Sequence, residues 1–408
     1  MRRPLALAAA AALAGCIEAP PSGKSIDAAP GDDTDAARVD DSVSYYLARG
    51  GRRSPGGADD LVVIGRRGDG SHVGVVLPAG ASGLEGAFQS AGWFELGDER
   101  AMDVTFGDGG VLVAGLAGRL TIAAEANAPL VLELQPNVAP RLVDVAPFPG
   151  DPRLMVAGPE RLWMQEAMAT EDSVPLHVVG DTFSDPVFMD VLLQPQGEPE
   201  DESDDIPFLG VVDGKDLGLH QIFADVPPQL GLDQAGTAVL PVVPTHALWR
   251  HIEGSAQALA FSSGSNELDW FRISFGGADS SAATGEVADL DEILDLLVVQ
   301  LDVGQNEVVI LGRRDGALVV VAYLEAIGFG GLQFANGKRE WAAPEGLDEV
   351  PLLAAADLEV DAVPGGDEIV LVESTGLVRC LDVTESALVE SCGSDLLSAP
   401  STSGRRGW

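Results

Sequence analysis

The chain is poor in histidine, cysteine, tyrosine and basic side chains. Five histidines, three cysteines and three tyrosines occur among 408 residues, and 64 acidic residues stand against 24 basic ones. The net charge of −40 at pH 7 repels phosphate backbones, so we expect no nucleic-acid partner. The histidines do not have the spacing of zinc ligands, and the sequence contains no nucleophile elbow, phosphate loop or metalloprotease helix. These absences argue against a catalytic site built from one linear motif.

A long apolar run is missing from the N-terminus as well. The run at residues 5–14 is too short to span a bilayer, which takes about 20 residues. It follows Arg2 and Arg3 and therefore predicts a secretory signal over residues 1–15. The run ends in Leu-Ala-Gly-Cys, which resembles the bacterial lipobox and implies that Cys16 is acylated and becomes the mature N-terminus. The alternative is an ordinary signal in which Cys16 is incidental.

Residues 16–42 are rich in Pro, Ala, Asp and Ser and contain few large apolar side chains. Such a segment cannot bury enough surface to offset its conformational entropy, so we predict a flexible acidic tether. Together with the lipobox, the tether predicts a protein attached through N-terminal lipid to the bacterial cell envelope. Ile17, rather than an aspartate, follows Cys16 and by analogy with enteric sorting indicates the outer membrane.

Two cysteines remain for the body of the protein, Cys380 and Cys392. An exported protein meets an oxidising compartment, in which such a pair usually forms a bridge. The intervening sequence reads as two strands around a turn near Glu385 and Ser386, and pairing about that turn places the two cysteines opposite each other. We therefore predict a disulfide; the alternative is two free, buried thiols.

Glycine and proline, by contrast, are plentiful, with 49 and 26 residues spread along the chain. Seven stretches share one arrangement: an apolar segment near an Asp, a turn, an apolar run closing on Gly, a tight turn and alternating apolar residues. The copies begin near Tyr45, Arg100, Arg141, Val187, His246, Val298 and Ala356, and their first-strand aspartates are Asp103, Asp144, Asp190, Asp302 and Asp357. Periods near 50 residues are typical of solenoids and propellers.

The strand-rich content of each copy predicts an all-β fold, a β-propeller of about seven four-stranded antiparallel blades over residues 43–393. Residues 394–408 are expected to be a disordered tail. The best helical candidate, residues 287–297, could equally lead into a strand. In the last blade we expect strands at 356–360, 368–372, 377–381 and 387–392. Ile369 and Leu371 should share one face, and Val370 and Val372 the other.

The copies resemble the FG-GAP/VCBS family of propeller repeats over residues 43–393. The nearest matches are "GGADDLVVIG" at 56–65 and "PGGDEIVLV" at 364–372, each with a Gly- and Asp-rich loop before an apolar strand. The resemblance implies an extracellular adhesive or binding module, sometimes loaded with calcium. Lipid-anchored propellers also occur in outer-membrane assembly machinery.

A calcium loop in that family needs several converging oxygen ligands. Asp357, Glu359, Asp361 and Asp367 approach this pattern, and they are the candidate metal ligands. The alternative is that these carboxylates only bond backbone amides in turns, with no cofactor.

These observations together predict a monomeric, lipid-anchored binding or scaffold module for an envelope protein or carbohydrate. The alternative is a propeller enzyme that acts on envelope or extracellular carbohydrate. An axial cluster of carboxylates and histidine would favour the enzyme, and an apolar or evenly acidic axial face would favour binding.

Overall fold

A computed structural model describes residues 43–397 in part. The segments outside the described set are 52–58, 81–82, 108–109, 116–118, 125–129, 134–140, 147–152, 159–160, 166–176, 179–182, 185, 195–205, 225–229, 253–255, 263–265, 275–280, 287–289, 300–306, 325–326, 329–330, 333–336, 346, 348, 359–366 and 385, besides both ends of the chain.

The described residues form seven antiparallel four-stranded sheets, each made of strands that follow one another in the chain except in blade 6, where a small hairpin precedes the fourth strand. Blade 1 contains β1 (Val43–Gly51), β2 (Asp60–Arg67), β3 (His72–Leu77) and β4 (Gly92–Gly97), and blade 2 contains β5 (Ala101–Gly107), β6 (Gly110–Gly115), β7 (Arg119–Ala124) and β8 (Leu130–Glu133). Blade 3 contains β9 (Leu142–Ala146), β10 (Arg153–Gly158), β11 (Arg161–Gln165) and β12 (His177–Val178). Blade 4 contains β13 (Pro186–Gln194), β14 (Ile206–Asp213), β15 (Asp216–Ala224) and β16 (Leu230–Val239).

Blade 5 contains β17 (His246–Ile252), β18 (Ala256–Ser262), β19 (Glu267–Ser274) and β20 (Ser281–Glu286). Blade 6 contains β21 (Glu292–Val299), β22 (Glu307–Arg314), β23 (Ala317–Tyr323) and β26 (Lys338–Ala342). Blade 7 contains β27 (Leu352–Ala356), β28 (Glu368–Val372), β29 (Leu377–Val383) and β30 (Leu388–Leu396). A small hairpin of β24 (Ile327–Gly328) and β25 (Gly331–Leu332) lies between β23 and β26 in the sequence. One helix occurs among the described residues, α1 (Gly83–Gln89), between β3 and β4. This single helix of the described part of the chain is neither long nor apolar enough to cross a membrane.

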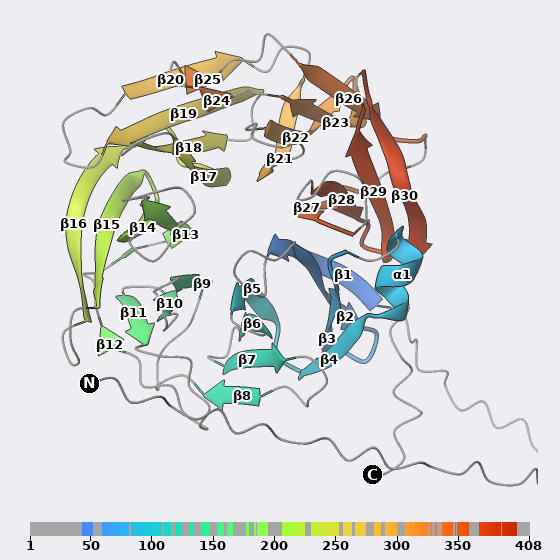
Figure 1. The fold of residues 1–408 in the computed structure, drawn as a ribbon, viewed down its shortest axis with the longest axis horizontal. Coiled ribbons are helices and arrows are strands. Elements are labelled where there is room, and N and C mark those ends of the chain that lie inside the picture. Colours follow the sequence, from blue (N-terminus) through green and yellow to red (C-terminus); the bar gives the residue numbers. More distant parts are fainter. Residues whose placement is uncertain are drawn as a thin grey trace, which may run out of the picture. The chain divides into compact units, whose positions relative to one another are not determined.

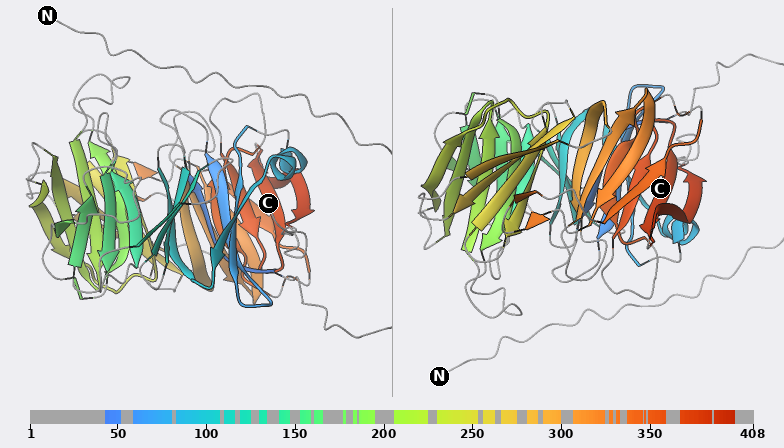
Figure 2. Two further views of the ribbon diagram at one scale, coloured as in Figure 1. Left: turned by 90° about the horizontal axis from the view of Figure 1, so that it is seen from below. Right: turned by 90° about the horizontal axis from the view of Figure 1, so that it is seen from above.

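The first strands of the seven sheets contact one another in sequence order, from β1 through β5, β9, β13, β17 and β21 to β27, which contacts β1 again. The sheets are therefore blades around a common axis, as Figure 1 shows down that axis and Figure 2 from the side. This confirms the prediction of an all-β propeller with about seven four-stranded antiparallel blades.

The core consists of side chains packed between neighbouring blades, and the last blade shows why both faces of its strands are apolar. Val370 and Val372 pack with residues of blade 1, whereas Ile369 and Leu371 pack with residues of blade 6. The alternation of side chains along a strand sends successive residues to opposite faces, so a blade between two neighbours needs apolar residues at every position. The predicted division of these four residues is confirmed.

Several predicted boundaries differ from the structure. The first strand of the last blade is β27, Leu352–Ala356, and not 356–360, because "LLAAA" is the segment that pairs with β28. The segment 287–297, for which helix and strand were both open, contributes strand β21 and no helix in its described part, which agrees with the strand alternative. The predicted tail begins too early, since β30 runs to Leu396 and Leu397 is buried in the core between blades 7 and 1.

No strand is exchanged between the first and last blades in the described residues, so packing and a few hydrogen bonds close the ring. The backbone N–H of Tyr45 donates to Ser374 O at 2.9 Å, and that of Asp357 donates to Asp59 O at 2.7 Å. Helix α1 contacts β30, and its Leu84 joins the core between blades 7 and 1. In Figure 2 this helix lies beside the strands of the last blade.

Candidate functional site

The first strands of all seven blades line an axial cavity of about 390 Å³. Apolar side chains outnumber charged ones among the lining residues, with Phe188, Met189 and Leu142 among the larger, but polar atoms form the greater part of the cavity surface. Arg49, Asp59, Asp103, Asp190 and Asp367 supply its charge. No histidine, cysteine, serine or threonine is among the described residues that line the cavity.

The carboxylate of Asp103 is used to join blades 2 and 3. Its Oδ1 accepts from the backbone N–H of Val104 at 2.9 Å, and its Oδ2 accepts from the backbone N–H of Val143 in the next blade at 2.9 Å. Arg49 adds an ion pair at 3.4 Å and donates to Val104 O at 2.9 Å. Burial raises the pKa of Asp103, and the Arg49 charge and these amides oppose the rise.

The guanidinium of Arg49 is held by acidic neighbours. Burial acts to lower its pKa, but the charges of Asp103, Asp144 and Asp190 outweigh this effect, so the pKa lies above its ordinary value. A cation so compensated stabilises the carboxylates around it and has little charge left for a ligand.

Asp295 is the counterpart of Asp103 in blade 6. Each follows a register shift in the first strand of its blade. Asp295 Oδ1 accepts from the N–H of Leu296 at 2.8 Å. Burial raises its pKa to about 6, against hydrogen bonds from the backbone of Leu296 and of Leu353 in the next blade. The repeated feature is thus a carboxylate that bridges the backbones of adjacent blades.

The sequence pattern points to Asp302 at this position, and Asp302 lies outside the described residues. Asp295 is missed by sequence reasoning because "EILDLLVV" is compatible with both helix and strand. The register shift that aims its side chain depends on pairing with β22. The sequence signal that could have identified Asp295 is an apolar segment interrupted by a single Asp.

The candidate calcium ligands are only partly within the described residues. Glu359 and Asp361 lie outside them. Asp367 lines the axial cavity, and the backbone N–H of Asp357 donates to Asp59 O at 2.7 Å. Among described residues, no three His, Cys, Asp or Glu side chains converge as metal ligands would. The calcium loop therefore stays a prediction.

The predicted cysteine sites have different positions in the structure. Cys16 lies outside the described residues. Cys380 is buried on β29 and disulfide-bonded. The register of β29 with β30 shifts between Arg379, which pairs with Ser394, and Leu381, which pairs with Glu390. The backbone of Cys392 therefore lies in the segment opposite Cys380, as a bridge between the two would require.

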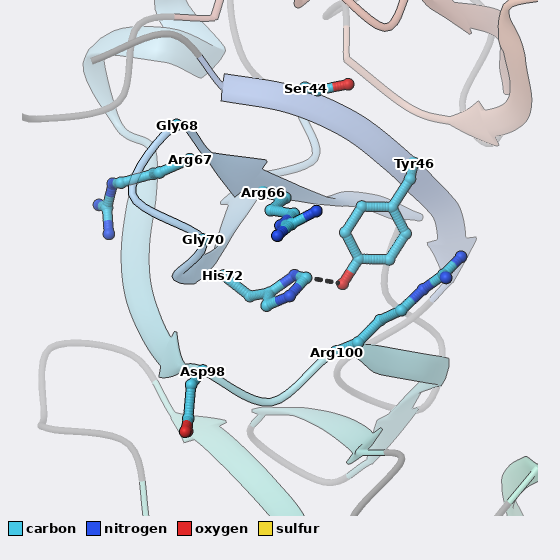
Figure 3. A pocket seen from close by; sticks show the side chains of 9 residues that line it. All are labelled: Ser44, Tyr46, Arg66, Arg67, Gly68, Gly70, His72, Asp98 and Arg100. Carbon is cyan, nitrogen blue, oxygen red and sulfur yellow. Dashed lines mark hydrogen bonds between the residues drawn. The ribbon is translucent and has the colours of Figure 1, made fainter. Parts of the chain in front are cut away.

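A second pocket, of about 630 Å³, lies at one end of blade 1 and is rich in basic side chains (Figure 3). Strand starts and ends alternate in an antiparallel blade, so the beginning of β1, the β2–β3 turn and the β4–β5 connection all meet at this end. They contribute Ser44, Tyr46, Arg66, Arg67, Gly68, Gly70, His72, Asp98 and Arg100.

Three of the polar side chains in this basic pocket form a connected group. The hydroxyl of Tyr46 accepts from the N–H of Ala101 at 3.0 Å and lies 3.0 Å from His72 Nδ1. The Arg100 guanidinium lies over the Tyr46 ring, 5.3 Å from its centroid. Burial, together with the nearby charges of Arg66 and Arg100, lowers the pKa of His72, so the imidazole is neutral at pH 7.

Comparison with known proteins supports the fold. No protein family and no curated protein matches the chain. Among solved structures, Sqt1 of Chaetomium thermophilum has a TM-score of 0.51 at 14% identity, with 86% of each chain covered. Sqt1 bound to the N-terminus of the ribosomal protein L10 has a TM-score of 0.50 at 13% identity, covering 84% of this chain and all of that one. BBS1N in complex with ARL6DN has a TM-score of 0.46 at 15% identity, covering 72% and 78%.

Proposed function

We propose that this protein is a lipid-anchored binding or scaffold module of the bacterial cell envelope, which engages a protein or carbohydrate. The observation that carries the proposal is the lining of the axial cavity. No histidine accompanies its carboxylates among the described residues, and one of these carboxylates, Asp103, is already bonded to the backbone and to Arg49. Such a lining favours contact with a partner over catalysis.

A propeller enzyme acting on carbohydrate needs an acid and a base that are free to exchange protons with substrate. Four carboxylates line the axial cavity without a histidine among the described lining residues, and one of them, Asp103, accepts hydrogen bonds from the main chain, as Asp295 does outside the cavity. His246 Nδ1 lies 3.7 Å from Asp295, but neither residue lines the axial cavity. These observations support the binding module over the enzyme.

The anchoring part of the proposal rests on the sequence. Arg2 and Arg3, the short apolar run and Cys16 have the order of a lipoprotein signal. Several acyl chains would hold the protein durably at the membrane, where a single chain would not. The likeness of the repeats to FG-GAP/VCBS modules supports an extracellular or envelope setting. The Sqt1 complex is a propeller bound to a protein N-terminus, which is one kind of partner for this proposal.

Anchoring is tested by the Cys16→Ala variant, expressed in a bacterial host with metabolic labelling by an alkynyl fatty acid. Wild-type protein should carry the label and fractionate with membranes, and the variant should be unlabelled and released or left as precursor. A variant that is still processed, labelled and membrane-bound would contradict lipidation at Cys16.

Binding is tested by cross-linking the wild-type protein in intact envelopes and identifying the adducts, with the purified protein incubated in parallel with envelope polysaccharide. A reproducible protein or glycan adduct, without depolymerisation, is expected. Turnover of the polysaccharide by the purified protein would contradict a binding module and establish the enzyme instead.

A further inference from the structure

The basic pocket of blade 1 stands out in a chain whose net charge is −40. Its three arginines do not have the same surroundings. Arg67 is buried and makes a two-pronged contact with Glu95, at 2.5 and 3.0 Å. Arg66 and Arg100 are exposed, and neither has a carboxylate within ion-pair distance in the described part of the chain. Asp98 also lines the pocket, and in Figure 3 its side chain points away from Arg66 and His72.

Blade 6 contains the same Gly-Arg-Arg sequence and serves as an internal comparison. Arg314 there contacts Glu340 at 2.5 and 3.0 Å, as Arg67 contacts Glu95. This pair is therefore a shared structural feature of the two blades. The preceding arginines differ: Arg313 lies 3.7 Å from Glu292, whereas Arg66 has no such partner among the described residues.

Strand register explains the difference. Glu292 pairs with Arg313 across β21 and β22, and the residue that pairs with Arg66 across β1 and β2 is Ser44. On the other side, Arg313 pairs with Leu318, whereas Arg66 pairs with His72. Blade 1 thus lacks the neutralising carboxylate that blade 6 has, and it has an imidazole beside the uncompensated guanidinium.

The tautomer of His72 is set by the hydrogen bonds of Tyr46. The Tyr46 oxygen accepts a hydrogen bond from the backbone N–H of Ala101. The Tyr46 hydroxyl proton is then donated to His72 Nδ1, which lies within hydrogen-bond distance. Nδ1 then carries no proton, and the proton of the neutral ring sits on Nε2. His72 is 5% exposed, and its Nε2–H has no acceptor among the described residues. A buried donor without a partner costs free energy that a ligand can recover.

We propose that Ser44, Arg66, His72 and Arg100 form an anion-binding pocket in blade 1 that takes a phosphoryl group. Arg66 and His72 supply neighbouring donors. The Arg100 guanidinium, which in Figure 3 lies on the other side of the Tyr46 ring from these two, adds positive charge at the edge of the pocket. A phosphate carries up to two charges and three acceptor oxygens, which suit two guanidinium groups and an imidazole N–H better than the single charge of a carboxylate. The pocket does not depend on the proposed anchor or partner.

The test uses the purified protein and measures binding of inorganic phosphate and of glycerol 3-phosphate by calorimetry at fixed ionic strength. Acetate is measured in the same way as a carboxylate control. Saturable binding of at least one phosphate ligand is expected, and weaker binding of acetate. If glycerol 3-phosphate binds more tightly than inorganic phosphate, the pocket is assigned to the phosphoryl group of a larger ligand. If inorganic phosphate binds more tightly, the pocket is assigned to the free ion. Absence of phosphate binding, or acetate that binds as well, overturns the proposal.

The matched variants are Ser44→Glu, Arg66→Gln and Arg313→Gln. Ser44→Glu gives Arg66 the carboxylate that Glu292 supplies in blade 6, and Ser44 and Arg66 are both exposed, so folding should be retained. Ser44→Glu and Arg66→Gln should each weaken phosphate binding at least tenfold, and Arg313→Gln should leave it unchanged. Unchanged binding in Ser44→Glu, or an equal loss in Arg313→Gln, contradicts the pocket.

A second readout covers the case of a variant that fails to fold. The imidazole proton resonances of wild-type protein are followed by NMR during the phosphate titration. The His72 resonances should shift with the same dissociation constant as in calorimetry, and those of His220 in blade 4 should not. Binding without any change at His72 would contradict its role as a donor.

Discussion

At the scale of single residues, side chains and their absence fix how blades meet. Asp103 joins neighbouring backbones with its carboxylate. Gly50 acts through its lack of a side chain, because a Cβ there would lie 1.5 Å from the carbonyl oxygen of Ala355. Gly50 is on β1 and Ala355 on β27, so this close backbone approach lies where the ring closes.

Gly50→Ala should therefore destabilise the protein, by about 1–3 kcal/mol or more, because the main chains of blades 1 and 7 must separate to admit a methyl group. Chemical denaturation of the purified protein measures the change. Gly92→Ala is the matched control: it also lies in blade 1, on β4, and a Cβ there meets no atom within 4 Å. Equal stability of the two variants would show that β1 and β27 are not in close contact.

At the scale of elements, the hairpin of β29 and β30 combines a tight turn with a register shift. Thr384 closes the turn, since its Oγ1 donates to Ala387 O at 2.7 Å and accepts from Ala387 N–H at 3.1 Å. The register shift lies between Arg379 and Leu381, and it leaves residues 391–393 opposite Cys380. This arrangement supports the predicted bridge between Cys380 and Cys392 at the outer edge of the last blade.

Because of the predicted bridge, the native exported protein should show no reactive thiol after denaturation without reductant. Reduction should lower the free energy of unfolding by roughly 2–3 kcal/mol, because the short loop is no longer constrained in the unfolded chain. Thiol labelling with mass spectrometry and denaturation with and without reductant measure both effects. A Cys380→Ser, Cys392→Ser variant should match the reduced wild type. Two labelled cysteines in the unreduced protein would rule out the bridge.

At the scale of the whole molecule, the described residues show a ring closed without strand exchange. The first and last blades are held together by the packing of β1 against β27, by the packing of α1 against β30, and by the buried Leu397. The Tyr45 hydroxyl, 3.5 Å from Leu397 O, also lies at this junction. Burial of the hydroxyl raises the Tyr45 pKa to about 12, with the nearby Arg67 opposing the rise, so it stays protonated at neutral pH.

Truncation at two positions tests how the last residues of β30 hold the ring closed. Ending the chain after Leu397 keeps every described closing contact and should leave the unfolding midpoint unchanged. Ending it after Gly393 removes the pairs of Leu377, Val378 and Arg379 with β30 and the buried Leu397, and should cost at least about 2 kcal/mol. Denaturation curves of the two proteins measure the difference. Equal midpoints would show that residues 394–397 do not hold the ring together.

The sequence by itself determined the class of fold and the approximate number of blades. Turn residues and period-two apolar segments are local signals, and their recurrence at seven places needs no knowledge of contacts. The faces of Ile369 to Val372 could be predicted for the same reason, since alternation along a strand is a property of the backbone. Cys380 and Cys392 could be set opposite each other because a single turn separates them.

The remaining features were decided only by tertiary structure. The role of Asp295 depends on a register shift against β22, and the burial of Leu397 depends on a blade that lies some 350 residues earlier in the chain. The basic pocket depends on which residue pairs with Arg66, because Ser44 and Glu292 occupy equivalent places in two blades whose loops differ in length. Pairing register and contacts between distant segments are set by the packing of the whole ring, and no short stretch of sequence contains them.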